Sequence, residues 1–110
     1  MIEPILNEIE PLIVNELYRA NLTNPPFHSS HEGVAIIEEE VEESKESLEI
    51  VFHCFHSLKN NVFNDRYPEA DKEAVLMRKH VKYAIAELVQ VAAMCDKFYG
   101  IRGDDNGDKQ

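Results

Sequence analysis

Two pairs of carboxylate and amide side chains are spaced for metal binding on helices. Glu40 and Glu43 are three residues apart, and so are Glu87 and Gln90. Residues at this spacing are neighbours on a helix surface. Three carboxylates in a partly buried layer require a counter-charge, and all-oxygen ligands select a hard cation. We therefore expect Glu40, Glu43, Glu87 and Gln90 to bind Mg²⁺ or Mn²⁺.

The two pairs can meet only if the helices that carry them lie side by side. The intervening residues 64–68, Asn-Asp-Arg-Tyr-Pro, are typical of a turn. A short turn makes the flanking helices antiparallel. A register centred on Asp65 then places Glu40 opposite Gln90, and Glu43 opposite Glu87. The alternative is that the glutamates around residue 40 form only a solvated helix face.

The spacing of apolar residues predicts an all-α protein with three helices. The first covers roughly residues 3–21, and Pro11 should either kink it or mark its true start. The second begins at a capping box, in which Ser29 is followed three residues later by Glu32. It continues to about residue 62, with apolar residues that alternate three and four apart.

The second and third helices should form a long antiparallel hairpin. The apolar pattern of the second helix is interrupted only at Ser44, beside the glutamate run. Asp71 could cap the third helix, which we expect to run to about Tyr99. Gly100 is a plausible C-terminal cap.

Length and charge restrict the possible classes. A chain of 110 residues has room for one domain, which we place at 1–100, with a flexible polar tail at 101–110. The net charge of −10, from 21 acidic and 11 basic residues, argues against binding to nucleic acid or anionic membranes. No apolar run approaches the ~20 residues of a membrane span. Residues 1–10 carry three glutamates and no basic residue, unlike a signal peptide, so we expect a cytoplasmic protein.

Several other side chains have a functional and a structural interpretation. Arg78 and Lys82 share a helix face and could contact a bound phosphate, or they could form only surface ion pairs. His28 and His31 flank the start of the second helix, where they could contact a nucleotide or belong to a polar capping loop. Phe27 could stack on a base, or pack as a hydrophobic staple.

The two cysteines, Cys54 and Cys95, do not make a disulfide framework. The expected register places them far apart along the hairpin. We expect both to be reduced thiols in the core.

The acidic residues resemble a known motif set. Residues 39–43, Glu-Glu-Val-Glu-Glu, match the E-E-x-x-E motif of the all-α nucleoside triphosphate pyrophosphohydrolases, the MazG-like superfamily. Residues 87–90, Glu-Leu-Val-Gln, stand where that family has E-x-x-D. Residues 27–35 and 90–94 resemble a phage-type branch of the superfamily.

The resemblance implies a magnesium-dependent hydrolase that converts a nucleoside triphosphate to the monophosphate and pyrophosphate, in nucleotide-pool cleansing or management. Glu40, Glu43 and Glu87 would be metal ligands, and Glu39 would be a ligand or would orient the attacking water. Glu39 and Glu43 are the expected catalytic residues. Gln90 departs from the family pattern, because a neutral amide replaces the usual aspartate.

We expect a homodimer or a higher homo-oligomer. Long helices leave wide apolar faces uncovered in one chain, and two chains could complete a four-helix bundle. Two other functions fit the same residues. One is a catalytically weak protein that binds metal or nucleotide, and the other is a structural dimeric helical module.

Overall fold

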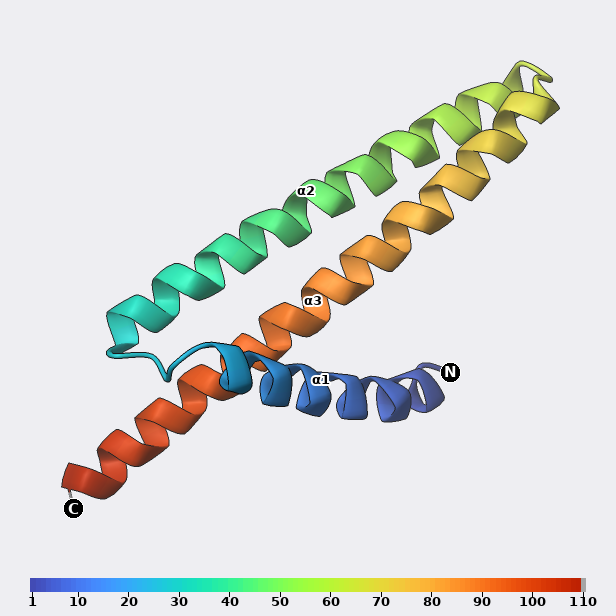
Figure 1. The fold of residues 1–110 in the computed structure, drawn as a ribbon. Coiled ribbons are helices and arrows are strands. Elements are labelled where there is room, and N and C mark those ends of the chain that lie inside the picture. The colour runs from blue at the N-terminus through green and yellow to red at the C-terminus, as the bar shows by residue number, and fades with distance from the viewer. Residues whose placement is uncertain (110) are drawn as a thin grey trace. The chain divides into compact units, whose positions relative to one another are not determined.

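The protein consists of three α-helices. The computed structural model describes the backbone of residues 1–109 and the side chains of residues 1–100. The helices are α1 (Glu3–Thr23), α2 (Ser30–Phe63) and α3 (Tyr67–Lys109) (Figure 1). Residues 1–109 contain no β-strand. The expectation of an all-α fold with three helices is confirmed.

Helix α1 begins at Glu3 and continues through Pro11. The prediction that Pro11 marks the true start of the helix is therefore wrong. At the other end, the Asn24 N–H donates to Ala20 O at 2.9 Å. Asn24 itself is extended, with φ −131° and ψ 143°. This conformation suits a residue that precedes Pro25, because the proline ring disfavours helical geometry before it.

The start of α2 has the Ser29 cap of the predicted capping box. Ser29 Oγ accepts the N–H of Glu32 at 3.1 Å. The Glu32 carboxylate accepts the N–H of His28 at 3.2 Å. The Ser29 side chain thus satisfies one unpaired N–H of the first turn of α2, whereas Glu32 accepts from His28, one residue before the cap, instead of from Ser29 as in a complete capping box.

The chain reverses direction between α2 and α3 in a Schellman motif. The N–H of Arg66 donates to Asn61 O at 2.8 Å, and the N–H of Asp65 donates to Val62 O at 3.1 Å. Asp65 has φ 58°, in the left-handed region. The predicted turn and its centre at Asp65 are confirmed.

Replacing Asp65 with Gly should stabilise the protein by about 0.5–1 kcal/mol. A glycine adopts a positive φ without the steric cost that a Cβ imposes. The gain is reduced by loss of the Tyr67 hydroxyl bond to Asp65 Oδ1, which is long at 3.3 Å and exposed. Urea unfolding at one fixed protein concentration measures the change. A fall in unfolding free energy would contradict it.

Helix α3 starts earlier and ends later than predicted. It begins at Tyr67, because Pro68 is compatible with a first helical turn, where its missing N–H costs nothing. Asp71 is consequently inside the helix, and its predicted capping role is wrong. The helix also continues past Gly100 to Lys109, so the predicted cap at Gly100 is wrong. The flexibility expected of residues 101–110 stays a prediction.

The chain divides into two compact units, to both of which α2 and α3 contribute. Unit 1 comprises Met1–Val41 and Leu88–Gln110, and unit 2 comprises Glu42–Glu87. The core of unit 1 is formed by three buried residues, Phe27, Ala93 and Met94. Partly buried apolar side chains from all three helices pack around them: Ile13, Leu17, Ala20, Ile36, Ile37 and Phe98.

Unit 2 is an antiparallel helical hairpin (Figure 1). Ser47 donates to Glu87 across it. Ser47 lies one turn after Glu43, the residue expected opposite Glu87, so this hydrogen bond is displaced by one turn from the expected register. Ser44, the break in the apolar pattern, is buried and only 3% exposed. The buried apolar residues of unit 2 are Val51, Cys54, Ala70 and Ala84.

One row of the predicted apolar seam on α2 is exposed in this single chain. Val34, Val41, Phe55 and Val62 are all exposed, Phe55 by 47%. The interleaved positions Ile37, Ser44, Val51 and Leu58 are buried or half-buried. Leu48, which belongs to the same row as Val34, is half-buried. The heptad pattern therefore supplies two rows, of which one is buried or half-buried and the other is mostly exposed in the described part of the chain. No helix in the described part of the chain is long and apolar enough to cross a membrane.

The two thiols should differ strongly in reactivity. Cys54 is 2% exposed, and burial, with Glu73 nearby, raises the pKa of its thiol. Cys95 is exposed, so the prediction that it is a core thiol is wrong. Since the thiolate is the reactive form, a disulfide reagent should modify Cys95 at least about tenfold faster in the native protein. Equal rates, followed by mass spectrometry of each site, would contradict this expectation.

Candidate functional site

Unit 1 contains a pocket of about 560 Å³. All three helices and the segment between α1 and α2 contribute to its lining. Its volume lies within the usual range of small-molecule sites. The pocket is lined by residues of the predicted acidic site, Glu39, Glu40 and Gln90.

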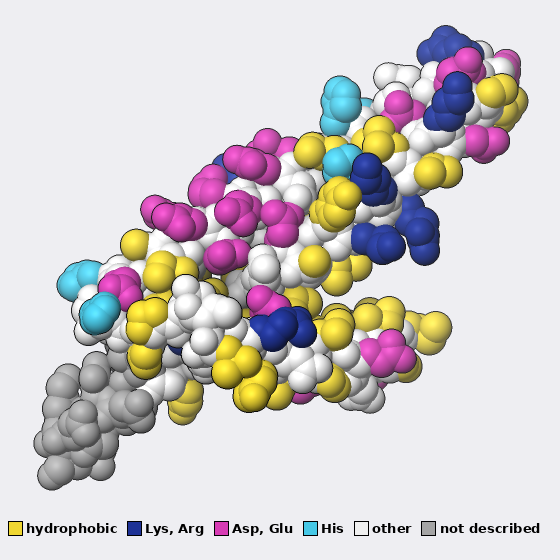
Figure 2. All heavy atoms as spheres, viewed as in Figure 1, with side chains coloured by type: hydrophobic (Ala, Val, Ile, Leu, Met, Phe, Trp, Pro, Cys, Tyr) yellow, Lys and Arg dark blue, Asp and Glu magenta, His cyan; other side chains and the backbone are white. Residues whose placement is uncertain are grey.

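Glu40 and Gln90 lie around this pocket from different helices. Both side chains are half-buried, and Oε2 of Glu40 is inaccessible to solvent. Glu39 lines the pocket but is exposed, so water reaches its carboxylate. Figure 2 shows acidic side chains gathered over α2, where the exposed ones include Glu38, Glu39, Glu42, Glu43, Glu46 and Glu49.

The other two predicted metal ligands belong to unit 2. Glu43 is exposed, whereas Glu87 is half-buried and accepts a hydrogen bond from Ser47. The hydroxyl of Ser47 restrains Oε1 of Glu87. Sequence reasoning did not identify Ser47, although its spacing of four from Glu43 places it on the same side of α2.

The donor chemistry of the pocket suits a hard cation. Carboxylate oxygens from Glu39 and Glu40 and an amide oxygen from Gln90 are the ligand types that Mg²⁺ and Mn²⁺ prefer. Among the residues whose side chains are described, no three His, Cys, Asp or Glu form a group that could hold a metal ion. The pocket therefore offers part of the oxygen donor set that the sequence predicts.

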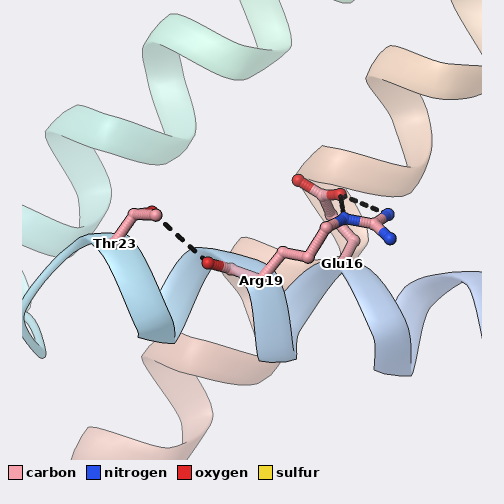
Figure 3. Close-up of polar contacts among 3 residues, drawn as sticks. All are labelled: Glu16, Arg19 and Thr23. Carbon is pink, nitrogen blue, oxygen red and sulfur yellow. Dashed lines mark hydrogen bonds and ion pairs between the residues drawn. The ribbon is translucent and has the colours of Figure 1, made fainter.

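Two basic side chains that the sequence did not single out also line the pocket. On α1, Arg19 donates from Nη2 and Nε to Glu16 Oε1, at 2.8 and 3.2 Å (Figure 3). Thr23, one turn further on, donates to the carbonyl oxygen of Arg19 at 3.3 Å (Figure 3). The side chain of Arg19 is exposed, so solvent screens the ion pair between Arg19 and Glu16.

Lys97 is the second basic residue of the pocket, and it is only 8% exposed. Its Nζ lies 4.8 Å from the centroid of the Phe27 ring. The sequence held a usable signal, because Gln90, Met94 and Lys97 are spaced four and three apart and thus share one face of α3. All three line the pocket.

Phe27 is a core residue. It is 6% exposed, and Lys97 occupies the space over its ring. Gly33 is buried beneath it, and a Cβ there would lie only 2.9 Å from Phe27 Cδ2 and 2.7 Å from Phe98 Cδ2. The packing role predicted for Phe27 is confirmed, while base stacking would require displacement of Lys97.

The remaining candidates lie outside this pocket. Arg78 and Lys82 are exposed in unit 2 and line a separate pocket of about 360 Å³. In the described part of the chain neither forms an ion pair, contrary to the structural interpretation of these residues. His28 and His31 are exposed beside the cap of α2, and only the backbone of His28 takes part in that cap.

No protein-family model, curated protein or solved structure matches this chain in comparisons with known proteins.

Proposed function

We propose that this protein is a magnesium-dependent pyrophosphohydrolase of the MazG-like type, which cleaves nucleoside triphosphates to the monophosphate and pyrophosphate in the cytoplasm. The supporting observation is the pocket of unit 1. It combines oxygen donors from Glu39, Glu40 and Gln90 with the cations of Arg19 and Lys97. A polyphosphate with its divalent cation requires both kinds of group.

Glu40 and Gln90 are the pocket residues best placed to hold the cation. Both are half-buried, which restricts their side chains and removes competing water. Glu43 and Glu87 remain candidate ligands on the strength of the motif. When bound, Mg²⁺ would polarise a phosphate oxygen and offset charge on the polyphosphate.

Glu39 is the candidate general base. Its carboxylate is exposed at the pocket, so it can orient a water molecule and accept its proton. The water oxygen bonds to the α-phosphorus while the bond to the oxygen that bridges to the β-phosphorus breaks. Pyrophosphate leaves with that bond's electron pair. Glu43 is the second catalytic candidate, which the family resemblance supports.

Pyrophosphate release from a panel of nucleoside and deoxynucleoside triphosphates tests this proposal. Release should require Mg²⁺ or Mn²⁺ and stop when EDTA is added. The metal should also raise the melting temperature, because a ligand of the native state stabilises it. If folded protein shows neither release nor metal stabilisation, the proposal fails and a purely structural helical module is favoured.

Gln90 supports a second function, that of a catalytically weak protein that binds metal or nucleotide. Its amide supplies an oxygen but no negative charge, so the cation is held less strongly than by an aspartate. Metal stabilisation without pyrophosphate release would favour this function. Appearance of release in a Gln90→Asp variant would then show that the missing charge is the cause.

We also propose that the protein is a homodimer. The exposed row Val34, Val41, Phe55 and Val62 repeats at multiples of seven along α2, as in a helix that packs against another helix. Light scattering should give a mass twice the chain mass of 12.6 kDa. Val41→Glu together with Phe55→Glu should produce a folded monomer. A wild-type mass of one chain at micromolar concentration would contradict the proposal.

A further inference from the structure

Lys97 is a buried cation at the wall of the unit 1 pocket. It is 8% exposed, and it shares the pocket lining with Glu40 and Gln90. Among the residues with described side chains, no carboxylate lies within 4.0 Å of its Nζ. Its one specific contact in that part of the chain is the Phe27 ring, at 4.8 Å.

Burial of an ammonium group without a counter-charge is unfavourable. An ion removed from water loses its hydration, and a charged partner normally replaces that loss. The face of a phenylalanine ring compensates only partly, because its attraction comes from a quadrupole rather than a charge. An anion that enters the pocket would supply the counter-charge that the side chains of residues 1–100 do not provide.

The other basic residue of the pocket is already paired. Arg19 donates twice to Glu16, and its guanidinium is largely exposed. Lys97, by contrast, is buried and has no ion-pair partner among the side chains of residues 1–100. It also lies seven residues, or two helical turns, after Gln90 on α3. A ligand with several charged oxygens could therefore contact a cation at Glu40 and Gln90 and still reach Lys97.

We propose that Lys97 binds the polyphosphate chain of the nucleotide, in preference to the predicted residues Arg78 and Lys82. This inference rests on the proposed function for the identity of the ligand. It also assigns a role to a lysine that the acidic motif does not include. The ammonium group donates to non-bridging phosphate oxygens, and the Phe27 ring holds its side chain toward the pocket.

Inorganic tripolyphosphate is a probe that isolates this contact from base, sugar and catalysis. Titration calorimetry with Mg²⁺ present would compare the full-length protein with Lys97→Met and the matched surface variant Lys82→Met. Lys97→Met should weaken binding at least tenfold, whereas Lys82→Met should change it less than twofold. Lys97→Gln keeps a polar side chain of similar length and serves if Lys97→Met does not fold, as judged by circular dichroism.

The outcomes separate this inference from the proposed function. Wild-type affinity in both folded Lys97 variants, or absence of wild-type binding to tripolyphosphate, overturns the role of Lys97. Nucleotide hydrolysis by the wild type that is unchanged in Lys97→Met overturns it as well, while the proposed function stands. Lys97-dependent binding in a protein that never releases pyrophosphate supports the inference and removes the enzymatic function.

Discussion

Replacing Glu40 with Gln should reduce metal-dependent pyrophosphate release at least about 100-fold, because the variant loses a ligand charge at the cation that activates the substrate. Glu40 is the pocket carboxylate with an oxygen inaccessible to solvent, so water cannot readily take over its role. The amide has nearly the same shape, and the fold should persist. Initial rates at saturating Mg²⁺ and nucleotide measure the loss, with circular dichroism as the check on folding.

Glu42→Gln is the matched control for this variant. Glu42 lies in the same glutamate run on the same helix, but it is exposed and does not line the pocket. Both variants remove one negative charge, so a general electrostatic effect would appear equally in the two. We expect Glu42→Gln to keep at least about half of the wild-type rate. Equal losses, or a Glu40→Gln enzyme of wild-type activity, would exclude Glu40 as a specific ligand.

Local signals predicted much of the fold. The start of α2 follows from Ser29 and Glu32, whose side chains satisfy backbone groups within four residues. The turn centred on Asp65 is equally local, since its hydrogen bonds join residues 60–66. Such features depend on hydrogen bonds between residues close in the sequence, so they can be predicted from short sequence patterns.

Other helix boundaries could not be predicted, because the local sequence pattern is compatible with more than one structure. Proline is compatible with either a turn or a first helical turn, so Pro68 did not reveal that α3 starts at Tyr67. A glycine is likewise tolerated inside a helix, and Gly100 does not end α3. The heptad pattern of α2 showed two apolar rows but could not show that one of them is mostly exposed in the described part of the chain.

The sequence predicted only part of the candidate site, because some of its residues depend on tertiary contacts. Glu40 and Gln90 were predicted from residue types that suggest metal binding, and both line the pocket of unit 1. The expected register is less accurate, because Glu87 accepts its hydrogen bond from Ser47, one turn away from Glu43. Lys97 was missed because a lysine on a helix usually extends into solvent. Its significance comes from burial against Phe27, which is a tertiary contact between segments 70 residues apart.

Phe27→Ala should destabilise the protein by about 3–5 kcal/mol, the usual cost of removing a buried aromatic ring. The ring is 6% exposed in the core of unit 1, where Met94 and Ala93 pack around it. Gly33 approaches it so closely that the backbone of α2 would lose a direct contact. Since small domains are stable by about 5–15 kcal/mol, this loss is a large fraction of the total. Urea unfolding at fixed protein concentration measures it.

Two controls distinguish a packing effect from a general response to losing a phenylalanine. Phe52→Ala removes a ring that is 60% exposed, and we expect it to cost less than about 1 kcal/mol. Phe27→Leu keeps most of the buried volume and should cost about half as much as Phe27→Ala. Lys97 lies over this ring, so Phe27→Leu should also weaken tripolyphosphate binding. The loss of affinity should be larger than the added fraction of unfolded protein explains. If Phe27→Ala cost no more than Phe52→Ala, Phe27 would not be a core residue, and the positioning of Lys97 would lose its structural basis.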